Sequence, residues 1–260
     1  MRDAMMIANY HSHTWRCSHA TGTEREYVLA SRSRGMEIYG FSDHTPYPFP
    51  WYHVSWFRMK QEQLAEYVET IMSLRREFPD IQIPVGLEAE YYPKYFPELR
   101  SLLKDSGIEY LLLGQHYLDN EIGAHYSGNA TGDESLLKQY CAQTRDALQT
   151  GCYTYFAHPD LLHFKGSTAV YESHIRGLCR EARSCGIPLE VNLLGLERGK
   201  HYPDIRFWRV AAEENCSVIL GCDTHDPASL KSFASEEKAR TMIEGLGLKL
   251  LDRAELRPIP

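Results

Sequence analysis

The feature that most constrains this chain is a repeated alternation of short apolar runs with longer amphipathic segments. The apolar runs are bounded by polar residues or glycine. Strands that are covered on both faces of a parallel sheet have this pattern. We expect strands at residues 5–10, 37–42, 83–88, 110–115, 154–158, 188–194 and 217–222. Seven such strands separated by helices predict a parallel α/β fold.

The segments between these runs have helical periodicity. In the first of them, Thr23 and Glu26 form a capping-box pattern and Gly35 is a typical stop. We expect helices over residues 21–35, 59–77, 95–105, 134–150, 168–185, 204–215 and 235–246. Because we find no low-complexity linker and no internal repeat, we expect a single domain over residues 1–260.

Charge and composition exclude several classes of partner. The formal net charge of −7 argues against nucleic acid, because phosphate backbones attract surfaces rich in lysine and arginine. It leaves room for a local basic pocket that binds one phosphate. We find neither a signal-peptide pattern nor an apolar run of membrane-spanning length. The scattered cysteines form no CxxC pair and are typical of reduced thiols, so we expect a cytoplasmic protein of undetermined oligomeric state.

Residues of the types that bind metals directly follow six of the seven predicted strands. A single histidine in such a place is more often a hydrogen-bonded core or surface residue, so the interpretation depends on the joint pattern. His11 and His13 are the strongest pair, because alternate residues of a strand point the same way. The other strand ends carry Asp43, His44, Glu88, His116, His158, Asp223 and His225. Only a closed parallel barrel brings all these ends to one face, so we expect a barrel with a metal centre there.

The motifs HSHTWRCSH, GFSDHT, GLEAEY, GQHY, AHPD and GCDTHDP occur in this order between residues 9 and 227. The ordered set resembles the PHP (polymerase and histidinol phosphatase) family. The resemblance implies a distorted (β/α)7 TIM-like barrel with a trinuclear metal centre at the C-terminal face of the strands. It implies a first metal bound by His11, His13, Glu88 and Asp223, a second bound by Glu88, His116 and His158, and a third bound by His19, His44 and His225.

Within this family the chain is most similar to the histidinol-phosphate phosphatase branch, through the segments LEVNLLGLERGKHYP and HPDLLHFKG. The first segment implies that Arg198 clamps a phosphate, and the second implies a further basic contact from Lys165. Gln115 stands where this branch usually has a small residue, and it is a candidate substrate contact.

The resemblance implies hydrolysis of a small phosphate monoester, with L-histidinol phosphate of histidine biosynthesis as the expected substrate. Three divalent ions are expected as cofactors, and imidazole and carboxylate ligands suit zinc, iron or manganese. A hydroxide that bridges two metals is expected to attack phosphorus. The expected catalytic residues are Glu88, Asp223, His225 and Arg198.

Two alternatives stay open. The first is a PHP phosphoesterase for another small ester, a nucleotide or a short oligonucleotide, and the second is a non-catalytic metal-binding regulatory module. The segment 45–58, which is rich in proline and aromatic residues, also has two interpretations. It is either a packed cover over the barrel or a lid that excludes water from the site.

Overall fold

The computed structural model describes residues 5–259. Residues 1–4 and 260, which belong to the expected domain, lie outside the described part, as does the start of the segment examined for a signal peptide. Every strand pairing in the described part is parallel. The strands are β1 (Ala8–Asn9), β2 (Ile38–Tyr39), β3 (Phe41–His44), β4 (Val85–Ala89), β5 (Tyr110–Leu113), β6 (Tyr153–Phe156), β7 (Leu189–Asn192), β8 (Ser217–Gly221) and β9 (Lys249–Leu251).

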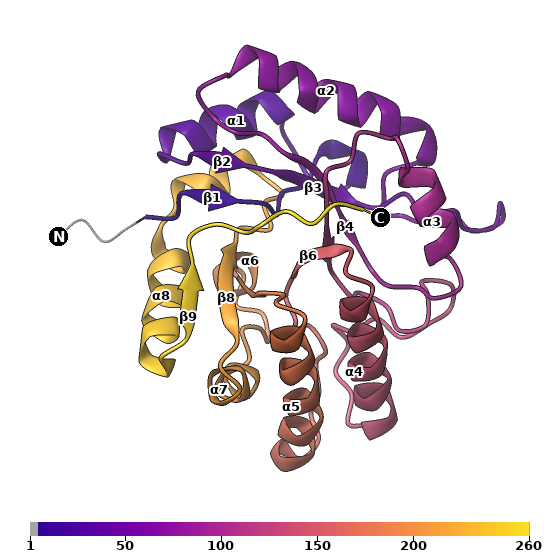
Figure 1. Cartoon of the computed structure of the whole chain (residues 1–260), viewed down its shortest axis with the longest axis vertical. Helices are drawn as coiled ribbons and strands as arrows, with labels where there is room; N and C mark the ends of the chain where they lie inside the picture. Colours follow the sequence, from indigo (N-terminus) through magenta and orange to yellow (C-terminus); the bar gives the residue numbers. More distant parts are fainter. Residues whose placement is uncertain (1–4, 260) are drawn as a thin grey trace.

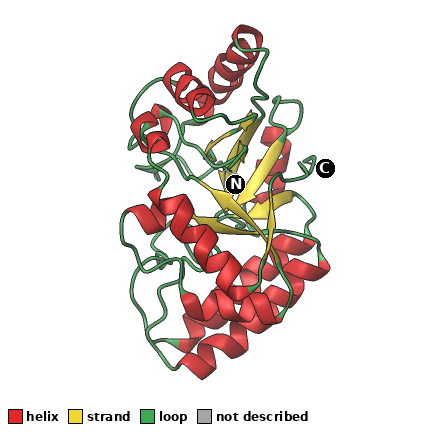
Figure 2. Ribbon diagram, turned by 90° about the vertical axis from the view of Figure 1, so that its left-hand side faces the viewer, coloured by secondary structure: helices red, strands yellow, loops and turns green. Residues whose placement is uncertain are grey.

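Each expected helical segment contains a helix. The helices are α1 (Glu24–Ser33), α2 (Leu64–Glu77), α3 (Phe96–Leu103), α4 (Glu134–Gln149), α5 (Thr168–Ser184), α6 (Leu193–Glu197), α7 (Ile205–Glu213) and α8 (Ala234–Leu246). The predicted capping box of Thr23 and Glu26 is present at the start of α1. Helices α1 and α2 lie on one side of the strands, and α4, α5, α7 and α8 lie on the other (Figures 1 and 2). The α/β class is therefore confirmed.

Three local features differ from the predictions. The second predicted strand is divided at Gly40 into β2 and β3, and the predicted sixth strand gives way to α6 from Leu193 onward. A further short strand, β9, pairs with the beginning of β8. Such differences are expected where a strand must bend sharply or where a polar side chain caps a helix inside an apolar run, as Asn192 does for α6.

The strands form two parallel sheets, β1–β2 and β3 to β9 in sequence order. Short bridges join the sheets. Ser12, beyond β1, pairs with Thr224, beyond β8, and Ile38 of β2 pairs with Gln82 just before β4. The His13 amide donates to the Thr224 carbonyl at 2.9 Å. The ring of strands is thus completed by irregular contacts, and the fold is a distorted barrel.

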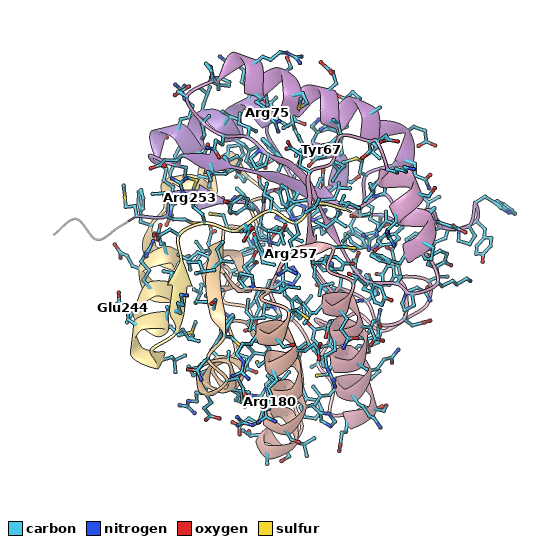
Figure 3. The ribbon with its side chains drawn as sticks, viewed as in Figure 1. Tyr67, Arg75, Arg180, Glu244, Arg253 and Arg257 are labelled. Atoms are coloured by element: carbon cyan, nitrogen blue, oxygen red, sulfur yellow. The ribbon has the colours of Figure 1, made fainter. Side chains whose placement is uncertain are left out.

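The two ends of the barrel interior differ. At the N-terminal end the interior is filled by the apolar cluster Ala8, Tyr10, Ile38, Tyr110, Leu112, Tyr155, Ala157 and Ile219. The C-terminal segment 252–259 crosses this end of the barrel, and Arg253 and Arg257 lie along it (Figures 1 and 3). Arg257 donates to Thr154 at the start of β6, and the Tyr10 hydroxyl donates to the Ala254 carbonyl. In the described part of the chain, no helix combines the length and apolar character needed to cross a membrane.

Candidate metal centre

All nine predicted metal ligands come together at the C-terminal ends of the strands. Glu88, on β4, lies at their centre. Its carboxylate oxygens lie 2.7 Å from His158 Nε2, 3.0 Å from His44 Nδ1 and 3.5 Å from His116 Nε2. His11 Nε2 and His13 Nε2 are each 3.6 Å from this carboxylate. One carboxylate therefore faces five imidazoles from four different segments, since His11 and His13 share the segment that follows β1.

The donor atoms form overlapping groups in which all atoms lie within 4.8 Å of one another. These groups are His11–His13–Glu88, His11–His158–Asp223, His44–Glu88–His116 and His19–His44–His225. The last group matches the set expected for the third metal. His44 also belongs to a group with Glu88 and His116, so the division of ligands among metals stays a prediction.

Several buried polar atoms of this cluster have no hydrogen-bond partner within the described chain. They include His11 Nε2, both ring nitrogens of His13, His44 Nδ1 and Glu88 Oε2. The last two atoms lie 3.0 Å apart but do not have the geometry of a hydrogen bond. Buried polar atoms are nearly always paired, because an unpaired one costs about 1–3 kcal/mol. Unpaired nitrogens and carboxylate oxygens that converge on one space are the donor set that divalent transition metals prefer. The residues present therefore fit divalent metal ions.

Two further carboxylates orient the histidines, and the sequence analysis did not identify them. Glu190, on β7, lies 2.9 Å from His11 Nδ1, and Glu90, just after β4, lies 2.9 Å from His116 Nδ1. A carboxylate that accepts the proton of one ring nitrogen leaves the other nitrogen free to bind a metal. The signal available in the sequence was a charged residue inside an apolar strand for Glu190, in LEVN, and directly after one for Glu90, in GLEAE.

Glycines on the neighbouring segments leave space for the carboxylates of Glu88 and Glu190. Gly114 lies where an added Cβ would overlap the Glu88 carboxylate, and Gly221 does the same for the Glu190 carboxylate. His158 and Asp223 have positive φ angles of 32° and 49°. Such angles are uncommon in residues other than glycine, and strained backbone is concentrated at functional sites.

The ionisable groups of the cluster shift one another's pKa values. Burial opposes ionisation of Glu88, but His116, His11 and His44 lower its pKa well below the ordinary range. Burial likewise opposes ionisation of Asp223, and His11 is the main group that lowers its pKa. For His44, burial and the neighbouring His13 lower the pKa well below its usual value. For His11, His13 and His158, burial opposes protonation, but neighbouring carboxylates raise the pKa, to about 9 for His13. The carboxylates are thus in the anionic form that binds metals, whereas an imidazole that holds a second proton would release it when a metal binds.

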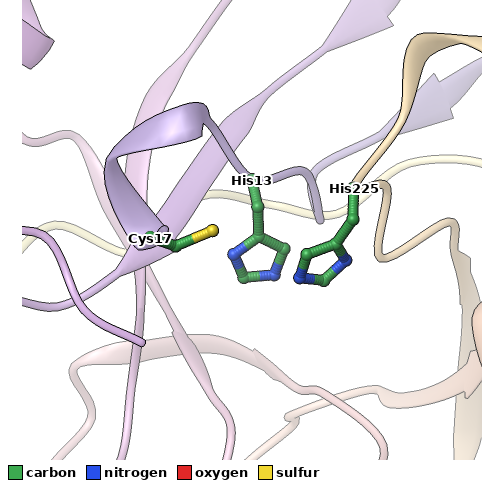
Figure 4. Close-up of side chains that lie close together, drawn as sticks. All are labelled: His13, Cys17 and His225. Atoms are coloured by element: carbon green, nitrogen blue, oxygen red, sulfur yellow. The ribbon is translucent and has the colours of Figure 1, made fainter. Parts of the chain in front are cut away.

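Cys17 lies beside the centre without a predicted role as a ligand. Figure 4 shows its side chain next to His13 and His225, whose rings stack with centroids 4.1 Å apart. The three residues can bring one donor atom each within 4.8 Å. Burial and the nearby Asp43 raise the pKa of the thiol, which favours its protonated form.

A cavity of about 380 Å³ opens over this cluster. The predicted phosphate clamp Arg198 lines it, together with Lys200. Neither forms an ion pair with a carboxylate of residues 5–259. Lys165 is exposed, and Gln115 is buried with its amide bonded to the main chain at Tyr91 and Tyr117. In the described structure, neither Lys165 nor Gln115 is among the residues that line the cavity, so their roles as substrate contacts stay predictions.

Aromatic residues form the remaining wall of the cavity. They are Trp56, Phe57, Tyr117, Tyr126 and Tyr202. Trp56 and Phe57 come from the segment 45–58. Phe57 is buried against His44, with ring centroids 5.0 Å apart, whereas Trp51 near the tip of the segment is 92% exposed. The segment thus has a packed base at the cavity and an exposed tip.

Comparison with known proteins agrees with this geometry. Residues 9–193 match the family described as the PHP domain. A probable histidinol-phosphatase of Deinococcus radiodurans is 32% identical over 236 residues, which cover 86% of this chain and 88% of that protein. The histidinol-phosphatase of Lactococcus lactis is 23% identical, with 94% of this chain and 92% of that protein covered.

A solved structure has the same fold over nearly the whole chain. It is the histidinol phosphate phosphatase of Lactococcus lactis in complex with zinc, L-histidinol and phosphate, with a TM-score of 0.75, 21% identity and 98% coverage of both chains. The putative histidinol phosphatase of Listeria monocytogenes has a TM-score of 0.71, 17% identity, and coverage of 88% of this chain and 99% of that one. The barrel, the donor cluster and the sequence matches together show that this chain belongs to the PHP family and is a phosphatase-type hydrolase.

Proposed function

We propose that this enzyme hydrolyses L-histidinol phosphate to L-histidinol and phosphate. The observation that carries the proposal is the construction of the cavity. Its floor holds the donor cluster around Glu88, one wall carries the cations Arg198 and Lys200, and another wall is aromatic. A phosphate monoester with a planar ring on its leaving alcohol matches these three surfaces. The similarity to proteins named histidinol-phosphatases supports the same substrate.

The proposed cofactors are three divalent ions, zinc, iron or manganese, divided among the ligands as the family resemblance implies. Bound there, divalent ions make water a better nucleophile near neutral pH and neutralise phosphate oxygens. Glu88, Asp223 and His225 would position the ions against the substrate. Lys200, which lines the cavity, is added as a second basic candidate, and the role of Lys165, which does not line the cavity, stays a prediction.

The Arg198 guanidinium and the Lys200 ammonium would hold the phosphoryl group by charge-assisted hydrogen bonds. Both cations lack a carboxylate partner among the described residues, so binding phosphate breaks no existing ion pair. The aromatic wall would enclose the ring of the leaving alcohol and exclude water from the phosphoryl group. A cytoplasmic location agrees with this function and stays a prediction.

Steady-state kinetics test the proposal. The protein is loaded with zinc, iron(II) or manganese, and kcat/KM is measured for L-histidinol phosphate beside glycerol 3-phosphate, a mononucleotide and a short oligonucleotide. We expect L-histidinol phosphate to be preferred by at least about tenfold, which corresponds to about 1.4 kcal/mol of transition-state discrimination. A clear preference for another ester would refute the substrate, and hydrolysis of none would favour a non-catalytic module.

A further inference from the structure

We propose that Arg58 is a positioning residue of the metal centre, which acts on His116 through Glu90. This inference rests on the proposed metal-dependent function. It concerns a residue of the segment 45–58 that does not line the cavity, and it gives that segment a role other than covering the barrel.

A continuous line of short contacts joins Arg58 to the centre. The Arg58 Nη2 donates to Glu90 Oε1 at 2.5 Å, and the same oxygen lies 2.9 Å from His116 Nδ1. On its other edge, His116 Nε2 lies 3.5 Å from Glu88. Arg58 also donates from Nε to Glu121 at 2.6 Å. Along this line only two side chains, those of Glu90 and His116, separate Arg58 from the central carboxylate.

Because Arg58 and Glu90 are buried, the contacts between them fix the orientation of the Glu90 carboxylate. The Arg58 residue is 4% exposed and Glu90 is 1% exposed, so neither charge is stabilised by bulk water. A buried carboxylate that loses its partner is destabilised by several kcal/mol and reorients or recruits water. While Arg58 holds Glu90, the carboxylate keeps one orientation and accepts the Nδ1 proton of His116. This tautomer leaves His116 Nε2 free to bind a metal.

The base of the segment 45–58 is fixed to the centre at both ends. Thr45 donates from its amide and its hydroxyl to the carbonyl of Glu88, at 3.0 and 2.8 Å. At the other end, the Arg58 guanidinium lies over the ring of Phe57 at 4.4 Å, and Phe57 contacts both His44 and His116. The packed base therefore sets the positions of two predicted ligands, whatever the exposed tip does.

A second buried pair offers a matched control. Arg34, which follows α1, donates to Glu236 of α8 at 2.6 Å, and the two side chains are 3% and 4% exposed. The Arg34 guanidinium also lies over an aromatic ring, that of Phe233, at 4.3 Å. It lies outside the donor cluster and the cavity. Loss of a buried arginine costs stability in both places, but only Arg58 is joined to a predicted ligand.

The test compares Arg58→Met, Arg58→Lys and Arg34→Met in the full chain. Zinc affinity is measured by competition with a chromophoric chelator, metal content by elemental analysis, and ligand geometry by the visible spectrum of the cobalt(II) form. We expect Arg58→Met to bind its weakest zinc about 10–100-fold less tightly and to change the cobalt spectrum, as loss of an orienting partner does elsewhere. The zinc affinity of Arg58→Lys should lie between those of Arg58→Met and the wild type. The lysine ammonium keeps the positive charge but lacks the planar group with which Arg58 contacts Glu90 and Glu121 together.

Arg34→Met should lower the melting temperature and leave zinc affinity and the cobalt spectrum unchanged. Wild-type zinc affinity in Arg58→Met, or an equal loss in Arg34→Met, would overturn the proposal. If Arg58→Met does not fold, Arg58→Lys decides, and wild-type zinc affinity and cobalt spectrum in that variant would overturn it. Because no readout uses turnover, a wrong choice of substrate leaves this test intact.

Discussion

At the N-terminal end of the barrel interior, the hydroxyls of Tyr10 and Tyr110 bond to main-chain carbonyls, whereas that of Tyr155 has no hydrogen-bond partner in the described chain. The Tyr110 hydroxyl lies 2.7 Å from the carbonyl of Tyr10 and 2.9 Å from that of Phe41. At the C-terminal end, His11, His13 and His44 are equally buried and keep ring nitrogens without partners. The same strands build both ends. The difference indicates that the N-terminal end contributes to the stability of the fold. At the C-terminal end, ring nitrogens stay unpaired at a cost in stability and are therefore available to bind a ligand.

The largest effect is expected from Glu88→Gln, which removes the central charge of the C-terminal end with little change of shape. We expect kcat to fall by about 10³-fold, since removing one group that organises transition-state charge costs about 10²–10³. The measurement is kcat on a phosphate ester, with metal content determined on the same sample. Activity within a few-fold of the wild type would remove Glu88 from the catalytic set.

Gly114→Ala tests whether the space beside Glu88 is required. The added methyl group would overlap the Glu88 carboxylate. We expect a loss of about 1–3 kcal/mol in unfolding free energy, as for other overpacked sites, and weaker zinc binding. Gly132→Ala is the control, because an added Cβ there meets nothing within 4 Å. Denaturant unfolding and zinc titration of both variants provide the measurement, and equal behaviour would count against the steric argument.

Tyr110→Phe probes the opposite end. Losing its hydroxyl leaves buried carbonyls without this donor, and we expect the unfolding free energy to fall by about 1–2 kcal/mol. Zinc affinity and kcat should stay at wild-type levels, because the hydroxyl lies away from the donor cluster. Thermal unfolding together with zinc titration checks this separation. A parallel loss of zinc would show that the two ends are not independent.

The smallest effect is expected from Arg253→Ala on the C-terminal segment. Arg253 pairs with Glu37, and both side chains are largely exposed, so the pair contributes at most about 0.5 kcal/mol. The melting temperature and activity should be nearly unchanged. A large loss of stability would mean that the C-terminal segment closes the N-terminal end more firmly than its contacts indicate.

Periodicity and strand-end residues were enough to predict a parallel α/β barrel and the clustering of eight of the nine donors, and the ninth, His19, was implied by the family resemblance. The predicted alternation holds in the structure, where the His11 and His13 side chains both face Glu88, because side-chain alternation is a local property of an extended chain. Pairings between distant residues left no local signal. Examples are the His11–Glu190 contact and the closure at Thr224, which join segments far apart in the chain.

The residues that contact the substrate were harder to predict than the metal donors. Lys165 and Lys200 are both basic and both follow a strand end at short range, so the sequence alone does not rank them. Only the structure shows that Lys200 lines the cavity. The amide of Gln115 joins main-chain groups of the neighbouring loops, and its role as a substrate contact stays a prediction.

Metal analysis of the wild type and of His19→Ala tests the central claim most directly. His19 and His225 approach each other at 2.9 Å between their Nε2 atoms, with His44 in the same donor group. After loading with zinc and removal of excess, we predict about three equivalents per wild-type chain and about two in His19→Ala. An unchanged content in His19→Ala, or no more than one equivalent in the wild type, would contradict a three-metal centre at the C-terminal end of the barrel.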